Sequence, residues 1–575
     1  MDEQLLDFRS IFNEKNSIIN EKAGEIIITS PKIELKGEYY IMYPSKFTSN
    51  CNTIIKTDGI FIISSNVSLS NLFFETYIVA ENSSNFSISN CTIKNATSIL
   101  AALTITDCKF GSISHITISG LTKQAGIVVN NNSFVKADNL LLYEISETLF
   151  VINTDSYVSI TDSDFHHSSA NGIHISNQSY LELTNSKFSH IAYPAIYVSK
   201  SRCSIKNNKF EDIDQNGISV HYGADLLIEN NEFTNIQGSA ISLLDESSGT
   251  IRENKIYKIH GNGVYCGNSV IKVHYNEFYD LIYPSIVVTN KSVARISNNN
   301  VEKVKYCGMA SRGALDVIIA ENVIKEVNEG GISISDTEKC LIESNQISDC
   351  SITGVECYNN SEVSLYDNVI SNSKKYAFLA YTSGHIKAEK NVIKNVEKAM
   401  VKLAFKGGGD FLNNVVEKCP NQCECQTTSF YFFNGNGDFK GVTNDPSRNS
   451  PSIDLEKPFV QETILCLKCN KNPRDYYLLD CGHKVYCKQC AEQALKNNEE
   501  CPLCRFPIVN VSNGFGVGND DMCIICFDKK ADSIILPCGH MGVCSDCLEN
   551  WFKNKDSCPI CRNEPSFYKK LGHDF

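Results

Sequence analysis

The sequence lacks every segment that would carry the chain into or across a membrane. No run of about 18 apolar residues occurs, so we expect no transmembrane helix and no membrane insertion. The first residues include Asp2, Glu3, Asp7, Arg9 and Glu14 without a long apolar stretch, so no secretory signal peptide is predicted. We therefore expect a cytoplasmic protein, with a nuclear location as the alternative.

An excess of positive charge is also missing. The formal net charge of the 575 residues is −13. Proteins that hold nucleic acid do so with clustered lysine and arginine on the phosphates, so this charge balance argues against a nucleic-acid partner.

Paired cysteine spacing is absent from most of the chain. Of the 26 cysteines, twelve are scattered between Cys51 and Cys425, and the remaining fourteen gather in two C-terminal clusters. Without a signal peptide, the scattered cysteines are predicted to be free thiols, and the clustered ones are predicted to bind metal.

What the chain does contain is an internal repeat of 22 or 23 residues. From Phe165 onward an apolar residue recurs once in each repeat, up to Val416. Two positions earlier stands an Asn in ten successive repeats: Asn208, Asn231, Asn254, Asn276, Asn299, Asn322, Asn345, Asn368, Asn391 and Asn414. A second column holds small residues: Gly172, Ala195, Gly217, Ala240, Gly263, Ser285, Gly308, Gly331, Gly354, Ala377 and Ala399.

Each repeat has the pattern of three short strands. After the small residue, apolar and other residues alternate, as in Gly217-Ile-Ser-Val, which predicts a strand with one buried face. No repeat offers a helical run. A single coil cannot bury its apolar face alone, so we expect stacked coils in which equivalent positions form ladders. The Asn at the turn is predicted to take a left-handed conformation and to hydrogen-bond to the next coil.

This pattern resembles the right-handed parallel β-helix of pectate lyases and of the repeats in some F-box proteins. The handedness is implied by the resemblance. We assign the β-helix to residues 41–420, an N-terminal cap with the first strands to 1–40, and a linker to 421–464. The amphipathic segment within 1–20 would cover the open end of the solenoid.

The two C-terminal clusters share one ligand spacing, with an offset of 57 residues. Eight ligands in four close pairs suit two tetrahedral zinc sites in each cluster. The predicted ligands are Cys466, Cys469, Cys481, His483, Cys487, Cys490, Cys501 and Cys504 in the first cluster, and Cys523, Cys526, Cys538, His540, Cys544, Cys547, Cys558 and Cys561 in the second.

This order of ligands closely resembles the RING finger. We assign finger 1 to residues 465–506, a linker to 507–521, finger 2 to 522–563 and a tail to 564–575. The resemblance implies a cross-brace: the first and third ligand pairs of each finger share one zinc, and the second and fourth pairs share the other. Modules this small depend on metal for their fold, so four Zn²⁺ ions are expected. The predicted fold class is mainly β: a parallel β-helix solenoid followed by two zinc-stabilised RING fingers.

The resemblance to ligase RING fingers implies a ubiquitin-protein transferase that forms no covalent intermediate. Its partners would be a ubiquitin-conjugating enzyme, ubiquitin and a protein substrate. Finger 2 has the residues expected on the enzyme-binding face, Ile525, Trp551 and Pro559, and places Arg562 where a guanidinium would hold ubiquitin and the enzyme together. Alternatively, Trp551, which is the one Trp of the chain, is a core residue of the short helix after Cys547.

Finger 1 departs from that pattern. Lys468 and Ala494 stand where finger 2 has Ile525 and Trp551, although Arg505 matches Arg562. The recruiting role is therefore assigned to finger 2.

A possible substrate surface lies on the strand that follows the small residue. Residues such as Ile173, Ile175, Val264 and Cys266 are predicted to point inward. The outward set contains aromatic and imidazole side chains that stacking would align along one side: His174, Tyr197, His221, Tyr265, Tyr358 and Tyr381. The alternative is a solvated sheet face.

Two other functions stay open at this point. A non-catalytic zinc-binding scaffold would have the same fingers but no need for Trp551 and Arg562. A carbohydrate-active β-helix enzyme would need paired carboxylates at coil spacing, and the sequence shows none.

Overall fold

The computed structural model describes two parts of the chain. The first covers residues 24–436 apart from 36–38, 42, 64–65, 83–84, 95–100 and 427. The second covers residues 466, 468–469, 471–472, 476–478, 483–497, 499, 508, 511–512, 515–516, 533–536, 540–552 and 567–570. They belong to two compact units, Met1–Arg448 and Asn449–Phe575. The expected cap within 1–20 lies outside the described residues.

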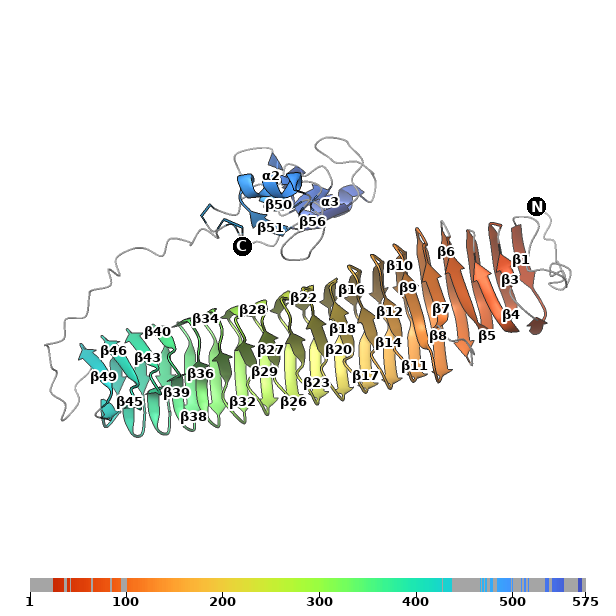
Figure 1. Cartoon of the computed structure of the whole chain (residues 1–575). Helices are drawn as coiled ribbons and strands as arrows, with labels where there is room; N and C mark the ends of the chain where they lie inside the picture. The colour runs from red at the N-terminus through yellow and green to blue at the C-terminus, as the bar shows by residue number, and fades with distance from the viewer. Residues whose placement is uncertain are drawn as a thin grey trace. The chain divides into compact units, whose positions relative to one another are not determined.

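The first unit is a parallel β-solenoid (Figure 1). A typical coil consists of β19 (Arg202–Lys206), β20 (Lys209–Ile213) and β21 (Ile218–His221). Each strand pairs in parallel with the equivalent strand of the next coil; β20, for example, pairs with β23 (Glu232–Ile236). In the described part of the solenoid, 49 strands join in this hydrogen-bonded system.

Three sheets run along the solenoid, and all three continue toward the N-terminus through the strands before Ala125. In the regular coils, sheet 1 runs from β10 (Phe134–Asp138) to β49 (Phe430–Asn434) and contains β19. Sheet 2 extends from β11 (Leu141–Ile145) to β47 (Val415–Glu417) and contains β20. Sheet 3 extends from β9 (Ala125–Asn130) to β48 (Cys423–Cys425) and contains β21.

The core is the space that the three sheets enclose. The residues predicted to point inward, including Ile173, Ile175, Val264 and Cys266, are fully buried. The repeated apolar column is also confirmed: the rings of Phe188 and Phe210, for example, stack with centroids 5.0 Å apart. One continuous apolar cluster results, as the period-2 alternation predicts.

The Asn column forms a hydrogen-bonded ladder at the turn between sheets 1 and 2. The backbone N–H and the Nδ2 of Asn208 both donate to Oδ1 of Asn231, at 2.9 and 3.0 Å, and the pattern continues to Asn436. The contact with the next coil is therefore confirmed. The predicted conformation is wrong: the left-handed residue is the one before the ladder Asn, for example Asn207 with φ 57°. That residue makes the tight turn, which leaves the ladder Asn free to point into the stack.

The small-residue column has a steric cause. A Cβ on Gly263 would stand 2.5 Å from the carbonyl oxygen of Ser285 in the next coil. The predicted last member of this column, Ala399, is wrong, however. Tyr376 pairs with Ala399 and Phe378 with Val401, so the register places Met400, not Ala399, beside Ala377.

The solenoid extends beyond the expected boundaries at its C-terminal end. β48 and β49 complete a coil after residue 420, where the sequence predicted a linker. At the N-terminal end, β4 (Ser45–Ile63) runs without a break along β1 (Gly24–Ile28), β2 (Lys32–Leu35) and β3 (Tyr39–Ile41). A disulfide joins Cys423 and Cys425, where free thiols were expected.

In the second unit, both fingers have the same elements at the same spacing. Finger 1 contains β50 (Tyr476–Leu478), β51 (His483–Tyr486) and α2 (Lys488–Lys496). Finger 2 contains β54 (Ser533–Leu536), β55 (His540–Val543) and α3 (Ser545–Phe552). The helix thus begins before Cys547, not after it. Among the described residues, no helix has the length and apolar character needed to span a membrane.

Each finger is closed by a strand beyond its expected boundary. β52 (Val511–Ser512) pairs with β50, although 507–521 was expected to be a linker. β56 (Phe567–Lys570) pairs with β54, although 564–575 was expected to be a tail. β53 (Phe515–Gly516), also within the expected linker, pairs with β55 of finger 2.

Candidate zinc centres and substrate face

One complete zinc site is visible in finger 1. The ligand atoms of Cys466, Cys469, Cys487 and Cys490 all lie within 4.8 Å of one another. The sulfurs of Cys469 and Cys487 are 3.9 Å apart. Two thiolates on a tetrahedral zinc, each about 2.3 Å from the metal, stand about 3.8 Å apart, so this cluster fits zinc.

The local fold explains why these four residues meet. Cys466 and Cys469 precede β50, whereas Cys487 and Cys490 flank the start of α2. The cluster joins the first and third ligand pairs, which is the cross-brace pairing implied by the RING resemblance. Asn472 donates from Nδ2 toward the Cys487 sulfur at 3.8 Å and so orients one ligand.

The pKa values of the thiols in this cluster shift in opposite directions: burial raises the pKa of Cys490, whereas hydrogen bonds lower the pKa of Cys469. Backbone N–H groups of Asn472 and Lys471 lower the pKa of the Cys469 thiol to about 6. Because zinc binds the thiolate form, hydrogen bonds that stabilise the anion also favour metal binding at neutral pH.

The other predicted ligands are described only in part. Cys481, Cys501, Cys504, Cys523, Cys526, Cys538, Cys558 and Cys561 lie outside the described residues. His483 and His540 are the first residues of β51 and β55. Cys544 is buried and Cys547 is half-buried at the start of α3, and they match Cys487 and Cys490 at the offset of 57.

The expected enzyme-binding face is also visible only in part. Ile525, Pro559, Arg562 and Arg505 lie outside the described residues. Trp551 lies in the last turn of α3 and is half-buried, so it is not a fully enclosed core residue.

Finger 1 differs at the two corresponding positions. Lys468 forms an ion pair of 2.6 Å with Glu499, which places a charged pair where finger 2 has Ile525. Ala494, the counterpart of Trp551, is completely buried in the core of the finger. An apolar contact surface is therefore missing at both described positions of finger 1.

The six aromatic and imidazole residues of sheet 3 are placed in two rows, not one. All six are half-buried. His174, Tyr197 and Tyr265 share a row, since Tyr197 pairs with Ser219. His221 pairs with Ser199 instead and belongs to a second row, two residues further along the strand, with Tyr358 and Tyr381.

Most of these side chains already have partners within the solenoid. The Tyr197 ring stacks on His221 with centroids 5.2 Å apart, and His221 Nδ1 is 3.1 Å from an Asp245 carboxylate oxygen. Tyr265 accepts a hydrogen bond of 3.1 Å from the hydroxyl of Thr289. These six residues, called the strip below, stay a predicted substrate surface. Their polar groups are less available to a ligand than the sequence suggested.

A buried carboxyl on the same face was not predicted from the sequence. Glu356 points outward from sheet 3, yet only 8% of its surface is exposed. Burial raises its pKa to about 7, and Tyr358 donates a hydrogen bond of 3.0 Å to it. The sequence did offer one signal for this residue, because Glu356 stands two positions before Tyr358 and therefore also points outward. The carboxyl packs against Gly330, where a Cβ would come 2.7 Å from the carboxyl carbon, so the absence of a side chain there makes room for it.

Family models match both parts of the chain. The model of the right-handed β-helix region matches residues 148–283 and 284–437, which together make half of the chain. The model of the C3HC4-type RING zinc finger matches residues 462–511 and 519–566.

The curated relatives match over the fingers. Over 112 residues the chain is 30% identical to E3 ubiquitin-protein ligase rnf8-B of Xenopus laevis, covering 19% of this chain and 20% of the relative. Over 54 residues it is 37% identical to putative E3 ubiquitin-protein ligase XBAT34 of Arabidopsis thaliana, covering 9% and 14%. The chain spans a fifth or less of the length of these relatives.

The solved structures to which the chain is similar are much more distant. They include the periplasmic alginate epimerase AlgG, with 10% identity, a TM-score of 0.24, and coverage of 65% of this chain and 77% of that one. The PL6 family alginate lyase AlyGC has 8% identity, a TM-score of 0.24, and coverage of 72% and 97%. We draw no functional argument from them.

The repeat, the ladder and the cysteine cluster agree with both family models. The chain therefore belongs to the right-handed β-helix family and carries two C-terminal RING fingers, which bind zinc.

Proposed function

We propose that the chain is a RING-type ubiquitin-protein ligase whose second finger recruits a ubiquitin-conjugating enzyme and whose β-helix binds the protein substrate. The observation that carries the proposal is the zinc cluster of Cys466, Cys469, Cys487 and Cys490, which joins the first and third ligand pairs as a RING finger requires. The similarity of the fingers to proteins named E3 ubiquitin-protein ligases supports it.

The chemistry would be one of positioning. Zinc holds each finger in shape. The thioester between ubiquitin and the conjugating enzyme is made elsewhere, and the finger raises its reactivity by holding the pair in one orientation. Arg562 would donate hydrogen bonds to both partners at once, because a guanidinium offers five N–H groups in a fixed plane.

Finger 2 is the proposed recruiting finger. It offers Ile525, Trp551 and Pro559 as an apolar contact face, and Trp551 is half-buried rather than enclosed. In finger 1 the equivalent of Ile525 is a lysine paired with Glu499. A conjugating enzyme that needs an apolar contact would have to break that ion pair, so finger 1 is disfavoured.

The test is self-ubiquitination of the full chain with a panel of conjugating enzymes. Ile525→Ala and Trp551→Ala should each abolish activity, while zinc content stays unchanged. Lys468→Ala is the matched control, because it changes the position in finger 1 equivalent to Ile525 and should leave activity intact. Full activity of both finger 2 variants would refute the assignment. A scaffold without ligase activity would show no ubiquitin transfer with any enzyme of the panel.

A further inference from the structure

The outer surface of sheet 2 carries a long groove that the sequence did not reveal. It crosses seven successive coils, from Asp280 to Pro420, and has a volume of about 1120 Å³. No residue of the strip on sheet 3 lines it.

The groove arises from a bend repeated in every coil. Asp280 and Lys303 occupy equivalent positions and have φ angles of 57° and 58°. Strand pairing skips this position: Tyr279 pairs with Glu302, and Leu281 with Val304. A left-handed residue between two extended ones bends the strand and changes the direction of its side chain. Stacked coils repeat the bend in register, so the bends merge into one continuous concave surface.

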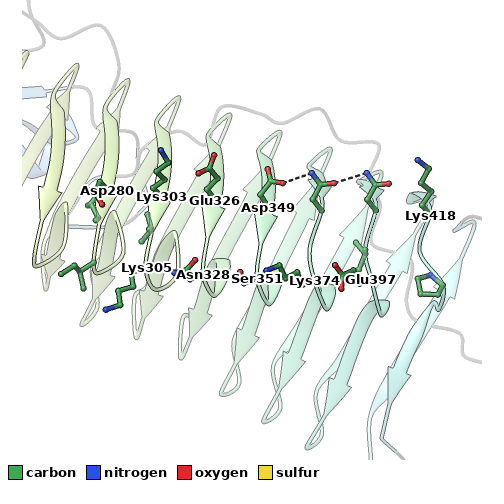
Figure 2. A pocket seen from close by; sticks show the side chains of 17 residues that line it. Asp280, Lys303, Lys305, Glu326, Asn328, Asp349, Ser351, Lys374, Glu397 and Lys418 are labelled. Atoms are coloured by element: carbon green, nitrogen blue, oxygen red, sulfur yellow. Dashed lines mark hydrogen bonds between the residues drawn. The ribbon is translucent and has the colours of Figure 1, made fainter.

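The side chains on this surface form two rows that cross the coils (Figure 2). Charges change sign along the groove: Asp280 lies in the first coil, Lys303 and Lys305 in the second, Glu326 and Asp349 in the next two, Lys374 in the fifth, and Glu397 and Lys418 in the last two. Among the described residues, none forms an ion pair with the five central side chains, from Lys303 to Lys374. Lys303 donates a hydrogen bond of 2.8 Å to the Tyr279 hydroxyl and Asp349 accepts one from Asn372, but both partners are neutral, so the five charges are not neutralised.

The centre of the groove offers amide groups as well. Asn372 donates to Asp349 at 2.9 Å and accepts from Asn395 at 3.1 Å, as the dashed lines in Figure 2 show. These bonds use one N–H and one lone pair of the Asn372 side chain. The second N–H and the second lone pair remain, and together they match the donor and acceptor of a peptide group.

We propose that this groove binds an extended segment of a protein substrate that carries acidic, basic and acidic side chains at alternate positions. Neighbouring coils are about 4.8 Å apart, so the Lys303 coil lies about 7 Å from the midpoint of Glu326 and Asp349. The Lys374 coil lies about 7 Å beyond that midpoint. In an extended strand, alternate side chains share a face and are about 6.7 Å apart. The spacing of the three charge sites thus matches every second residue of a strand.

Exposed aromatic rings beside the groove support a protein ligand. Tyr283 and Tyr306 follow the groove residues Ile282 and Lys305 in sequence, and their rings stack with centroids 5.2 Å apart. They are 48% and 38% exposed. Exposed tyrosine is enriched where proteins bind one another. As a substrate site, the groove rests on the ligase function proposed above.

The test is fluorescence polarisation with the full chain and a labelled synthetic peptide. The probe has Glu, Lys and Glu at alternate positions in a Ser/Gly background, and the comparison peptide has Lys, Glu and Lys. Three exposed charge pairs predict about tenfold tighter binding of the probe. The double variant Lys305→Glu with Lys374→Glu should abolish this preference, because Lys303 then faces a glutamate in its own coil and the Lys374 site changes sign.

Two control variants sharpen the experiment. Lys375→Glu with Lys398→Glu changes the net charge equally at exposed positions that do not line the groove, and it should keep the preference. Tyr197→Ala in the strip of sheet 3 should also keep it.

Four outcomes would overturn the proposal: equal affinity of the unmodified chain for both peptides, no binding of either at millimolar concentration, the same loss of preference in the control lysine pair, or loss of binding in Tyr197→Ala. Self-ubiquitination is measured in parallel. If it persists while peptide selectivity is absent, only the groove assignment fails. If it is absent in the unmodified chain, the ligase function fails, whatever the peptides show.

Discussion

Replacing Asn299 by alanine tests whether the Asn ladder holds the coils together. The Asn299 side chain takes part in five hydrogen bonds of 2.8 to 3.0 Å: it donates to Val273 O, Ser297 O and Asn322 Oδ1, and it accepts from the backbone N–H and Nδ2 of Asn276. It is 1% exposed. Asn299→Ala leaves the buried N–H of Asn276 without its acceptor, so we expect the free energy of unfolding to fall by about 3 to 5 kcal/mol.

The neighbouring Asn300 provides a matched control. It is exposed and undergoes the same chemical change, so Asn300→Ala should alter stability by less than about 0.5 kcal/mol. Asn299→Ser should recover about 1 kcal/mol, because a serine hydroxyl already accepts the N–H of the preceding coil at Ser186. Urea unfolding of the full chain, followed by far-UV circular dichroism, measures all three. Equal shifts for Asn299→Ala and Asn300→Ala would refute the reasoning.

Three further predictions concern single groups. Burial raises the pKa of Glu356 from 4.5 to about 7. Between these two pH values the folded chain keeps a proton on Glu356 that the unfolded chain loses. The free energy of unfolding should therefore fall by about 3 kcal/mol as the pH rises from 4.5 to 7. Glu356→Gln should remove that dependence in urea unfolding; an unchanged pH profile would contradict the prediction. Cys469→Ser should reduce zinc content by one ion per chain without loss of self-ubiquitination, because finger 2 is the recruiting finger; loss of both would contradict that assignment. Arg562→Ala should lower the rate of ubiquitin discharge while binding of the conjugating enzyme is unchanged, and equal losses of rate and affinity would argue against its role.

The repeat made much of the solenoid predictable. Phe188, Phe210 and the Asn ladder recur at one period, and a buried position in one coil implies a buried position in the next. The zinc cluster was predictable for a similar reason: the spacing of Cys466, Cys469, Cys487 and Cys490 marks them as ligands, and the RING resemblance supplied their pairing.

The errors came from positions where neighbouring residues compete for one role. Either Asn207 or Asn208 could have taken the left-handed turn conformation, and only the stacked coils show that Asn208 is needed for the ladder. Likewise, His221 looked equivalent to Tyr197 because both alternate outward. Because some coils have 22 residues and others 23, sequence spacing alone does not show which outward residues lie side by side. The backbone pairing shows that His221 lies beside Ser199, two residues beyond Tyr197 on the strand.

Local sequence was sufficient for the period, the buried columns and the identity of the metal ligands, because each depends on residue type at a regular spacing. The groove of sheet 2 required the assembled solenoid. A polar pair such as Tyr279 and Asp280 between two buried residues suits any surface strand, and nothing in the sequence of one coil distinguishes a left-handed bend from an ordinary exposed position. Only when seven left-handed residues stack in register do their side chains form one row, with a second row two positions further along the chain. The concave surface therefore depends on how the coils stack and not on the sequence of any single coil.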